Sequence, residues 1–418
     1  MFLFPGPAGP RSASYIPHKS LPSTVAVTMR LFLLVALGCV CRLVLAQVGP
    51  YYPVSFDLPF TKRYPREFVH PGLLHTADDF TRIKKYVFEE PTEPWVSAFA
   101  NFSANRFAQS DYTMAGPASY VQRGSPSSSS WTWWQNDAQG AYYNALMWAI
   151  TNDEAHARKG IEILTRWASV FTVVNGTDSQ LAAGLQGQLF VNAAEILRYL
   201  GPMNTTDYAS VTAMFFRAVA PALVPVGQAN YGVAAIQTLA SFAVALHDVT
   251  MWNSAMDRIQ NDPCVGLPFL FHPETGQNVD SGRDQGHSQV GTAWLASMVK
   301  IIENQGFPEV WNMADNLLLK GYEYLARYNM GDDDVPYDPS WARCQAVLVN
   351  GPWTEISNAS RGVQDGIFEL PYAKYVVKMG LEAPWVTKAV MANRPEQGTA
   401  DTPGFGTLLY NLRSSNST

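Results

Sequence analysis

Between residues 141 and 328, apolar side chains recur at three- and four-residue spacing in one segment after another. This spacing is the period of an α-helix that buries one face. Clusters of Gly, Pro and Asn, such as "GPMN" and "NDPCVGLP", separate the segments and mark turns. We find little strand-like alternation between residues 137 and 330. The predicted helices cover residues 141–150, 157–171, 189–200, 208–220, 233–248, 290–301 and 311–328.

Consecutive helices joined by short turns pack as antiparallel pairs. Many such pairs in a chain of 418 residues predict an all-α fold of the α/α-toroid type, an incomplete α/α barrel, rather than a small bundle. An α-solenoid is the alternative, but the chain lacks a side-chain repeat of fixed period. The composition, 47% hydrophobic and 15% charged, suits a protein with a large core. We expect one domain over residues 47–418.

Residues 29–46, "MRLFLLVALGCVCRLVLA", combine a basic flank, an apolar run and small residues before a cleavage position after Ala46. This pattern is typical of a secretory signal peptide and is short for a membrane span. Residues 1–28 form an extension rich in Pro and Ser, and Met29 is an alternative start. We therefore expect a secreted, extracellular protein without a membrane partner.

Glycosylation sequons and cysteines agree with export. Cys39 and Cys41 lie in the signal peptide, so Cys264 and Cys344 remain as one predicted disulfide of an oxidising compartment. Two unpaired buried thiols are the alternative. Five Asn-X-Ser/Thr sequons behind a signal peptide predict glycosylation, at Asn101, Asn175, Asn204, Asn358 and Asn416.

The charge balance excludes some classes of partner. The chain carries 29 Lys and Arg residues against 35 Asp and Glu residues. Residues 1–46 hold four basic and no acidic residues, so removing them leaves 25 basic against 35 acidic residues, a balance of −10. Such a chain has no basic footprint for nucleic acid. An anionic substrate would have to be attracted by a few local arginines and amide donors.

The stretch "NVDSGRDQGHSQVG", residues 278–291, places Arg283, Asp284 and His287 directly before a predicted helix. That helix and the next one, residues 311–328, are joined by a short turn and should lie antiparallel. The chain then returns to the level of His287. We expect one rim of the barrel to carry a shared set of polar side chains, namely Arg283, His287, Tyr324, Arg327 and Tyr328.

These residue types suit the removal of a proton next to the carboxylate of a uronic acid. Arginine neutralises the carboxylate through its planar fork, and asparagine can assist without charge. Histidine or tyrosine can take the C5 proton or protonate the leaving oxygen. The reaction needs no metal, and we expect no cofactor. A structural ion pair of Arg283 with Asp284, and a capping role for His287, fit the same residues equally well.

Four separated segments resemble the alginate lyase superfamily of polysaccharide lyases, particularly family thirty-eight. They are "QANYGVAAIQTLASFAVALHD", "DSGRDQGHSQVG", "ADNLLLKGYEYLARYNMGDDDVPYD" and "RPEQGTADTPGFGTLLY". The resemblance runs from about residue 136 to residue 411, and the segments occur in the same order. It implies an α/α toroid and eliminative cleavage of an anionic, uronate-containing polysaccharide such as alginate or glucuronan.

The resemblance also implies roles for single residues. Arg283 and His287 match the signature directly, and Asn230 matches an Asn that opens a helix and neutralises the carboxylate. Tyr231 stands where some relatives have histidine. The base is therefore left open among His287, Tyr231 and a rim tyrosine such as Tyr328.

Further residues are predicted to contact the substrate. The Ser-rich loop 117–136 ends in tryptophans that look exposed. Core packing at helical spacing is the alternative for these aromatic residues, and it fits Tyr143 and nearby Trp148 at least as well. The predicted groove residues are Trp133, Trp134, Tyr142, Tyr143 and Asn144 near this loop, with Asp284, Tyr324 and Arg327 on the rim.

Two other functions compete with the lyase. An inverting glycoside hydrolase on a similar barrel would use Asp284 with Glu355 or Glu369 as its carboxylate pair. A noncatalytic secreted carbohydrate-binding protein would use the tryptophan loop as a stacking surface. Elimination alone creates an unsaturated sugar with ultraviolet absorbance, so this product separates the three.

Overall fold

The computed structural model describes residues 58–63, 67–342, 344, 351–363 and 365–413. The described residues belong to one compact unit. The predicted leader, residues 1–46, and the sequon at Asn416 lie outside the described residues.

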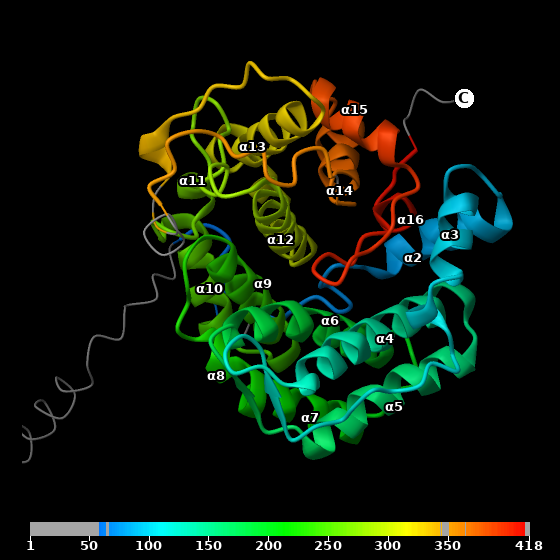
Figure 1. Cartoon of the computed structure of the whole chain (residues 1–418). Helices are drawn as coiled ribbons and strands as arrows, with labels where there is room; N and C mark the ends of the chain where they lie inside the picture. The colour runs from blue at the N-terminus through cyan, green and yellow to red at the C-terminus, as the bar shows by residue number, and fades with distance from the viewer. Residues whose placement is uncertain (1–57, 64–66, 343, 345–350, 364, 414–418) are drawn as a thin grey trace, which may run out of the picture. The chain divides into compact units, whose positions relative to one another are not determined.

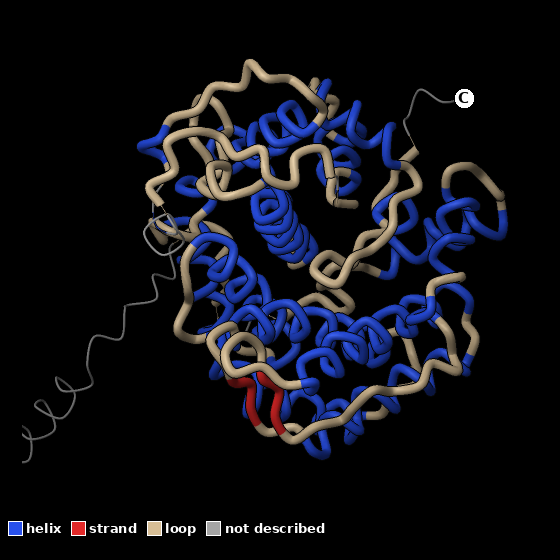
Figure 2. Tube along the Cα trace, in the orientation of Figure 1, coloured by secondary structure: helices blue, strands red, loops and turns tan. Residues whose placement is uncertain are grey.

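Helices dominate the described residues, which confirms the all-α prediction (Figures 1 and 2). The helices of the first part of the chain are α2 (Ala77–Lys84), α3 (Trp95–Ser103), α4 (Ser129–Thr151), α5 (Glu154–Val170), α6 (Ser179–Tyr199), α7 (Thr205–Met214) and α8 (Ala220–Leu223). Those of the second part are α9 (Ala229–Leu246), α10 (Val249–Asn261), α11 (Leu267–Leu270), α12 (Gln285–Asn304), α13 (Met313–Asn329), α14 (Glu369–Pro371), α15 (Pro384–Asn393) and α16 (Gly406–Leu409).

Helices α4, α6, α9 and α12 follow one another around the inside of a ring, and α5, α7, α10 and α13 return the chain (Figure 1). Contacts between α6 and α9 show that these inner helices are parallel. Gly184 packs against Ala234, and farther along both helices the Oε1 atom of Gln188 accepts a hydrogen bond from Ser241 at 2.8 Å. The amino-terminal ends of neighbouring inner helices therefore meet at the same end of the ring. This arrangement is the predicted α/α toroid.

Two short strands, β1 (Tyr120–Gln122) and β2 (Val173–Asn175), pair in parallel, with Val121 opposite Val174 (Figure 2). β1 precedes α4 and β2 precedes α6, so the pairing joins the starts of two inner helices. β2 lies inside the region in which the sequence indicated only helices. Three residues are too few to show an alternating pattern, which explains the omission.

The inner helices are buried around most of their circumference. Helix α9 is long and apolar enough to cross a membrane by length and composition, but 83% of its residues are buried inside the protein. It packs between α6 and α12. A core helix of this kind carries apolar side chains on all faces because protein surrounds it.

The structure lengthens several predicted helices at their beginnings. Helix α4 starts at Ser129, twelve residues before the predicted start, and α6 starts at Ser179. Trp131, Trp133 and Trp134 therefore lie on the first turns of α4 rather than in a loop. The prediction of an exposed tryptophan loop is wrong on this point.

Candidate active site

The motif at the start of α12 is organised by Asp284. Its side chain caps the helix, because Oδ1 accepts a hydrogen bond from the backbone N–H of His287 at 2.7 Å. Aspartate is a preferred residue at this position because it satisfies a helical N–H that has no partner within the helix. Oδ2 lies 2.7 Å from Nδ1 of the His287 ring. One carboxylate thus starts the helix and orients the imidazole.

The contacts of His287 define its tautomer. Nε2 lies 2.9 Å from Nη2 of Arg283, while Nδ1 faces Asp284. A guanidinium only donates and an ionised carboxylate only accepts, so Nδ1 carries the proton and Nε2 presents its lone pair. Burial raises the pKa of Asp284, but the hydrogen bonds from His287 and the charges of His287 and Arg283 outweigh burial and hold that pKa below its usual range. The carboxyl is therefore ionised near neutral pH.

Arg283 is held largely inside the protein, with 16% of its side chain exposed. Its Nη1 atom is buried and has no hydrogen-bond partner among the described residues. Its backbone turns tightly at Gly282, where an added Cβ would meet the hydroxyl of Tyr337 at 2.3 Å. A guanidinium with an unpartnered N–H at the end of a helix barrel is a ready site for an anion.

Asn230 meets this cluster from α9. The residue is 2% exposed, and its Nδ2 donor has no partner among the described residues. Gly291 of α12 permits the close approach, since a Cβ there would lie 3.3 Å from Cβ of Asn230. The backbone N–H of Asn230 acts to lower the pKa of the buried carboxyl of Asp280. Burial raises the pKa of Asp280 to about 6, against the charges of Arg283 and His287.

Tyr231 lies beside Asn230 and is half-buried. Its hydroxyl donates to Oδ1 of Asp178, the residue before α6, at 3.1 Å. Burial and Asp178 raise the pKa of this hydroxyl, while Arg123 and Arg283 act in the opposite direction. Two arginines therefore lie near this tyrosine.

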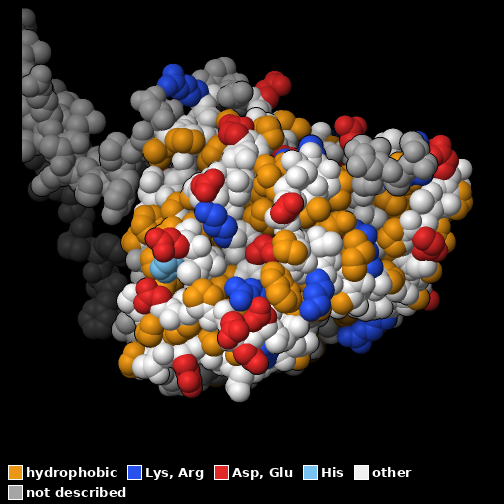
Figure 3. Space-filling view, turned by 90° about the horizontal axis from the view of Figure 1, so that it is seen from above, with side chains coloured by type: hydrophobic (Ala, Val, Ile, Leu, Met, Phe, Trp, Pro, Cys, Tyr) orange, Lys and Arg blue, Asp and Glu red, His pale blue; other side chains and the backbone are white. Residues whose placement is uncertain are grey.

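The amino-terminal ends of α6, α9 and α12 converge on this cluster, through Asp178, Asn230 and Asp284 respectively. Each end carries a partial positive charge from its unpaired N–H groups and the helix dipole. Together with two arginines, these ends favour an anion in a chain that is acidic overall. On the face shown in Figure 3, acidic and basic side chains are interspersed, so that face offers no broad basic patch.

The three predicted rim residues of α13 are placed as follows. The end of α13 does return to the start of α12, because Asn329 donates to Oε1 of Gln285 at 3.0 Å. The Tyr328 ring packs with Tyr324 and lies 3.9 Å below the guanidinium of Arg361. These contacts hold Tyr328 in its own small cluster rather than against His287.

Tyr324 and Arg327 make structural contacts. The hydroxyl of Tyr324 donates to the carbonyl of Pro336 at 2.8 Å, and burial raises the pKa of that hydroxyl. Arg327 Nε donates to Asp332 at 2.7 Å. Both side chains hold the loop that follows α13, and their predicted contact with substrate stays a prediction.

The predicted groove residues of α4 are mostly in the core. Trp134, Tyr142 and Asn144 are each 0% exposed and Tyr143 is 1% exposed, so the prediction that they touch substrate is wrong. Trp134 stacks on Phe190 with ring centroids 4.3 Å apart. The sequence pattern could not separate the groove from the core, because α4 is buried on nearly every side. Trp133, at 38%, is the exposed member of the set.

The glycoside hydrolase alternative pairs Asp284 with Glu355 or Glu369, and the structure excludes the pair with Glu369. Glu369 is buried, and its two oxygens accept hydrogen bonds from Arg394 at 2.7 and 2.5 Å. A carboxylate held in this bidentate ion pair is not available as a catalytic acid or base. Glu355 is exposed, on the loop after residue 350.

Three other predictions concern covalent features and metals. Cys264 and Cys344 are paired in a disulfide with their Cα atoms 5.8 Å apart. Among the described residues, no group of three or more His, Cys, Asp or Glu side chains is arranged to hold a metal ion. The sequon residues Asn175, Asn204 and Asn358 are exposed, and Asn101 is half-exposed.

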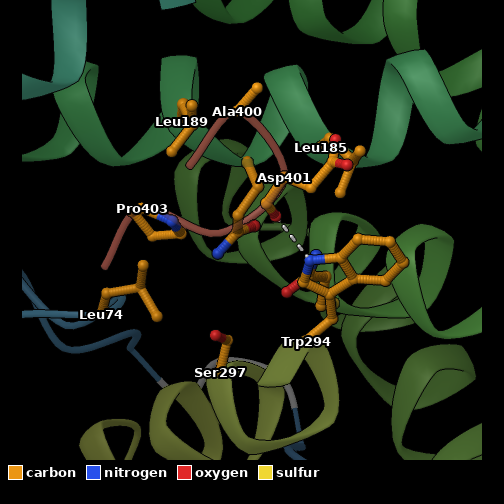
Figure 4. Close-up of a pocket in the computed structure, with 10 residues that line it drawn as sticks. Leu74, Leu185, Leu189, Trp294, Ser297, Ala400, Asp401 and Pro403 are labelled. Atoms are coloured by element: carbon orange, nitrogen blue, oxygen red, sulfur yellow. Dashed lines mark hydrogen bonds between the residues drawn. The ribbon is translucent and has the colours of Figure 1, made fainter. Parts of the chain in front are cut away.

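A small cavity lies deeper along the inner helices (Figure 4). Its lining includes Gln188, Gln237 and Trp294, and Trp294 Nε1 donates to the carbonyl of Asp401 at 2.8 Å. Gln237 and Trp294 follow Asn230 and His287 by seven residues each, or about 10 Å along a helix. The cavity therefore lies about two helical turns below the cluster.

Sequence reasoning missed three members of the cluster: Asp280, Asp178 and Arg123. Asp280 stands three residues before Arg283, in the same charged stretch, and could have been singled out. Asp178 and Arg123 belong to other segments, which the pairing of β1 with β2 brings to the start of α6. No local pattern marked either of them.

Comparison with known proteins bears on the fold. No family model and no curated protein sequence matches the chain. Alginate lyase A1-III from Sphingomonas species A1 has a similar structure, with a TM-score of 0.61 and 12% identity over 82% of this chain and 98% of that chain. A histidine-to-alanine variant of that enzyme in complex with a tetrasaccharide gives a TM-score of 0.61 and 13% identity over 82% of this chain and 98% of that one. An alginate lyase from Bacteroides ovatus gives 0.52 and 12% identity over 82% of this chain and 100% of that one. The chain has an alginate lyase-like fold.

Proposed function

We propose that the protein is a secreted polysaccharide lyase that cleaves a uronate-containing polysaccharide, of the alginate or glucuronan class, by β-elimination. The observation that carries this proposal is the cluster of Arg283, His287, Asn230 and Tyr231 at the converging starts of three inner helices. It combines anion-binding groups with groups that transfer protons. Elimination next to a carboxylate requires both.

Neutralisation of the carboxylate is the first requirement. Removing the C5 proton places negative charge on the carboxylate, and donors aimed at that charge lower the barrier. Arg283 offers its guanidinium fork, and Asn230 offers a buried Nδ2 donor that has no partner among the described residues. The helix ends add their dipoles. These groups are held in place before substrate arrives, which is the condition for electrostatic catalysis.

Proton transfer is the second requirement. In the proposed reaction a base takes the C5 proton, the C–H electrons form a double bond between C4 and C5, and the bond from C4 to the glycosidic oxygen breaks. An acid protonates that oxygen, so no water or oxidant is consumed. His287 Nε2 has the lone pair of a base, and the hydroxyl of Tyr231 lies at the same site. We assign proton transfer to these two residues acting together.

The structural neighbours support a sugar polymer as substrate. Alginate lyase A1-III binds a tetrasaccharide both as a histidine-to-alanine variant and as a tyrosine-to-phenylalanine variant. Histidine and tyrosine, the residue types replaced in those variants, also occur in the present cluster. Secretion is supported by the leader sequence, the exposed sequons and the disulfide.

An assay of uronate polymers tests the proposal. The protein is incubated with polymannuronate, polyguluronate, glucuronan and a neutral glucan, and both ultraviolet absorbance and reducing ends are followed. We expect both signals to rise together on at least one uronate polymer and neither on the glucan. Reducing ends without absorbance would indicate hydrolysis and contradict the proposal.

A further inference from the structure

Arg123 is a second arginine of the active-site cluster, and its backbone is rigidly placed. It follows β1 directly, and its N–H donates to the carbonyl of Asn175 at 3.1 Å. Its carbonyl accepts from the N–H of Asp178 at 3.2 Å. Gly176 makes this approach possible, because it adopts φ +97° and an added Cβ would lie 1.9 Å from the Arg123 carbonyl. The residue is thus fixed against the start of α6.

One face of the Arg123 guanidinium packs against an aromatic ring, and its Nη1 edge has no hydrogen-bond partner among the described residues. It lies 4.5 Å from the ring centroid of Trp131, on the first turn of α4. Its Nη1 atom is buried, with no hydrogen-bond partner in the described part of the chain. A half-buried cation normally gains an anionic partner, because its desolvation is otherwise uncompensated.

Arg123 and Arg283 belong to the starts of the two inner helices that neighbour the helix of Tyr231. Tyr231 is on α9, which packs between α6 and α12. Arg123 adjoins the start of α6 through Asp178, and Arg283 directly precedes the cap of α12. Both guanidinium groups lower the pKa of the Tyr231 hydroxyl, so their charges reach the same point. The segments that carry the two arginines therefore meet the helix of Tyr231 at the same end of the ring.

We propose that Arg123 binds a second carboxylate of the polysaccharide, on a sugar next to the one held by Arg283. This inference rests on the proposed function and names the substrate feature that the site requires: two uronates close together on one chain. Arginine stacked on an aromatic ring keeps its edge free for bidentate binding of a carboxylate. Arg123 then acts as a positioning and specificity residue, and the proton transfers remain with His287 and Tyr231.

The test compares Arg123→Gln and Arg123→Lys with the wild-type protein on a uronate homopolymer. Loss of a hydrogen bond between charged groups typically weakens binding about tenfold to a hundredfold. We expect Arg123→Gln to raise KM by that factor, with a smaller effect on kcat through the loss of its charge near Tyr231. Arg123→Lys, which keeps the charge but loses the fork, should raise KM less. The increase of KM with salt should be steeper for the wild type than for Arg123→Gln, because one ionic contact is missing in the variant.

Arg106→Gln is the matched control. The Arg106 guanidinium also lies on an aromatic ring, 4.3 Å from the centroid of Phe107, but it is exposed and belongs to the short helix Arg106–Ala108, outside the cluster. Its KM should equal that of the wild type. An unchanged KM in folded Arg123→Gln, or a kcat loss without a KM change, would overturn the inference.

Binding measurements separate this inference from the proposed function. Calorimetry with the products of polymer cleavage, and with a chemically prepared uronate trisaccharide, needs no turnover. If the wild type binds the trisaccharide but forms no unsaturated product from any uronate polymer, the proposed lyase activity fails. Equal trisaccharide affinity in the wild type and in Arg123→Gln would then still refute the role of Arg123. If Arg123→Gln does not fold, the affinity of Arg123→Lys for the trisaccharide is the deciding measurement. An affinity equal to that of the wild type would contradict a bidentate contact.

Discussion

Nη2 of Arg283 lies 2.9 Å from Nε2 of His287, so the residue that would hold the substrate carboxylate also covers the lone pair of the proposed base. Asp284 fixes the other side of the ring through Nδ1 at 2.7 Å. A carboxylate that draws the Arg283 fork toward itself would release Nε2 in the tautomer that accepts a proton. Binding and base activation are coupled in this arrangement, and the first prediction follows from it.

Asp284→Asn should reduce turnover on uronate polymer on the order of a hundredfold or more. Asparagine caps a helix about as well as aspartate, so the free energy of unfolding should change by about 1 kcal/mol or less. The amide no longer specifies the Nδ1–H tautomer of His287, and a misoriented or wrongly protonated base loses rate. The measurement is the initial rate together with the thermal midpoint.

Asp248→Asn is the control for that change, because Asp248 caps α10 through Met251 N–H at 2.9 Å and has no such histidine. It should keep the wild-type rate. A wild-type rate in Asp284→Asn would show that Asp284 is only a cap.

Arg283→Lys should be severely impaired although the charge is kept. Lysine lacks the planar fork that holds a carboxylate through two parallel hydrogen bonds. The loss of one such transition-state contact costs about 3 kcal/mol, or on the order of a hundredfold in rate. Arg258→Lys, which alters a surface ion pair with Asp262 at 2.9 Å, should leave the rate unchanged. Near-full turnover in folded Arg283→Lys would make Arg283 a structural residue.

The division of labour between His287 and Tyr231 can be read from rate against pH. Burial and Asp178 raise the pKa of the Tyr231 hydroxyl, despite Arg123 and Arg283. If tyrosine carries both proton transfers in His287→Ala, the residual rate should be low and its optimum should move to higher pH. Tyr231→Phe should lose rate without that displacement. A His287→Ala variant with the wild-type rate and profile would remove His287 from the mechanism.

The buried carboxyl of Asp280 makes a prediction about stability. Burial raises its pKa from an ordinary 3.8 to about 6. The folded protein therefore binds this proton more tightly than the unfolded chain does. The stability that the protonated Asp280 carboxyl contributes is fully present below about pH 4 and is lost as the pH rises through about 6. The free energy of unfolding of Asp280→Asn should not show this decrease. Above pH 6 it should exceed that of the wild type by on the order of 2 to 3 kcal/mol. Chemical unfolding of both proteins from pH 4 to pH 8 measures the difference. A constant difference across that range would contradict the shift.

The helical fold could be predicted because apolar spacing records the period of each helix. The cap and ring contacts of Asp284 and His287 are local, within four residues, so the motif itself pointed to them. The groove prediction for Trp134 and Tyr142 was wrong because α4 is buried on nearly every side, so its sequence pattern does not distinguish a groove-facing side chain from a core side chain. Arg123 escaped notice because its place depends on strand pairing with residues about fifty positions away.

The rotation of α13 about its own axis also could not be predicted from the sequence. Its end lies at the level of the candidate active site, as the hydrogen bond from Asn329 to Gln285 shows, but the neighbouring tyrosine packs beneath Arg361. A helix turns by about 100° per residue, so a correct level along the axis does not specify which side chain faces the site. Only the packing of the following loop determines it.

The central claim is that this cluster cleaves uronate polymers by elimination. The most direct measurement is the ultraviolet absorbance of unsaturated product over time, for wild type and His287→Ala at equal concentration, on alginate and glucuronan, with thermal midpoints measured in parallel. We predict a steady rise with the wild type and almost none with a folded His287→Ala. No rise with the wild type on any uronate polymer, or an equal rise with His287→Ala, would contradict the account.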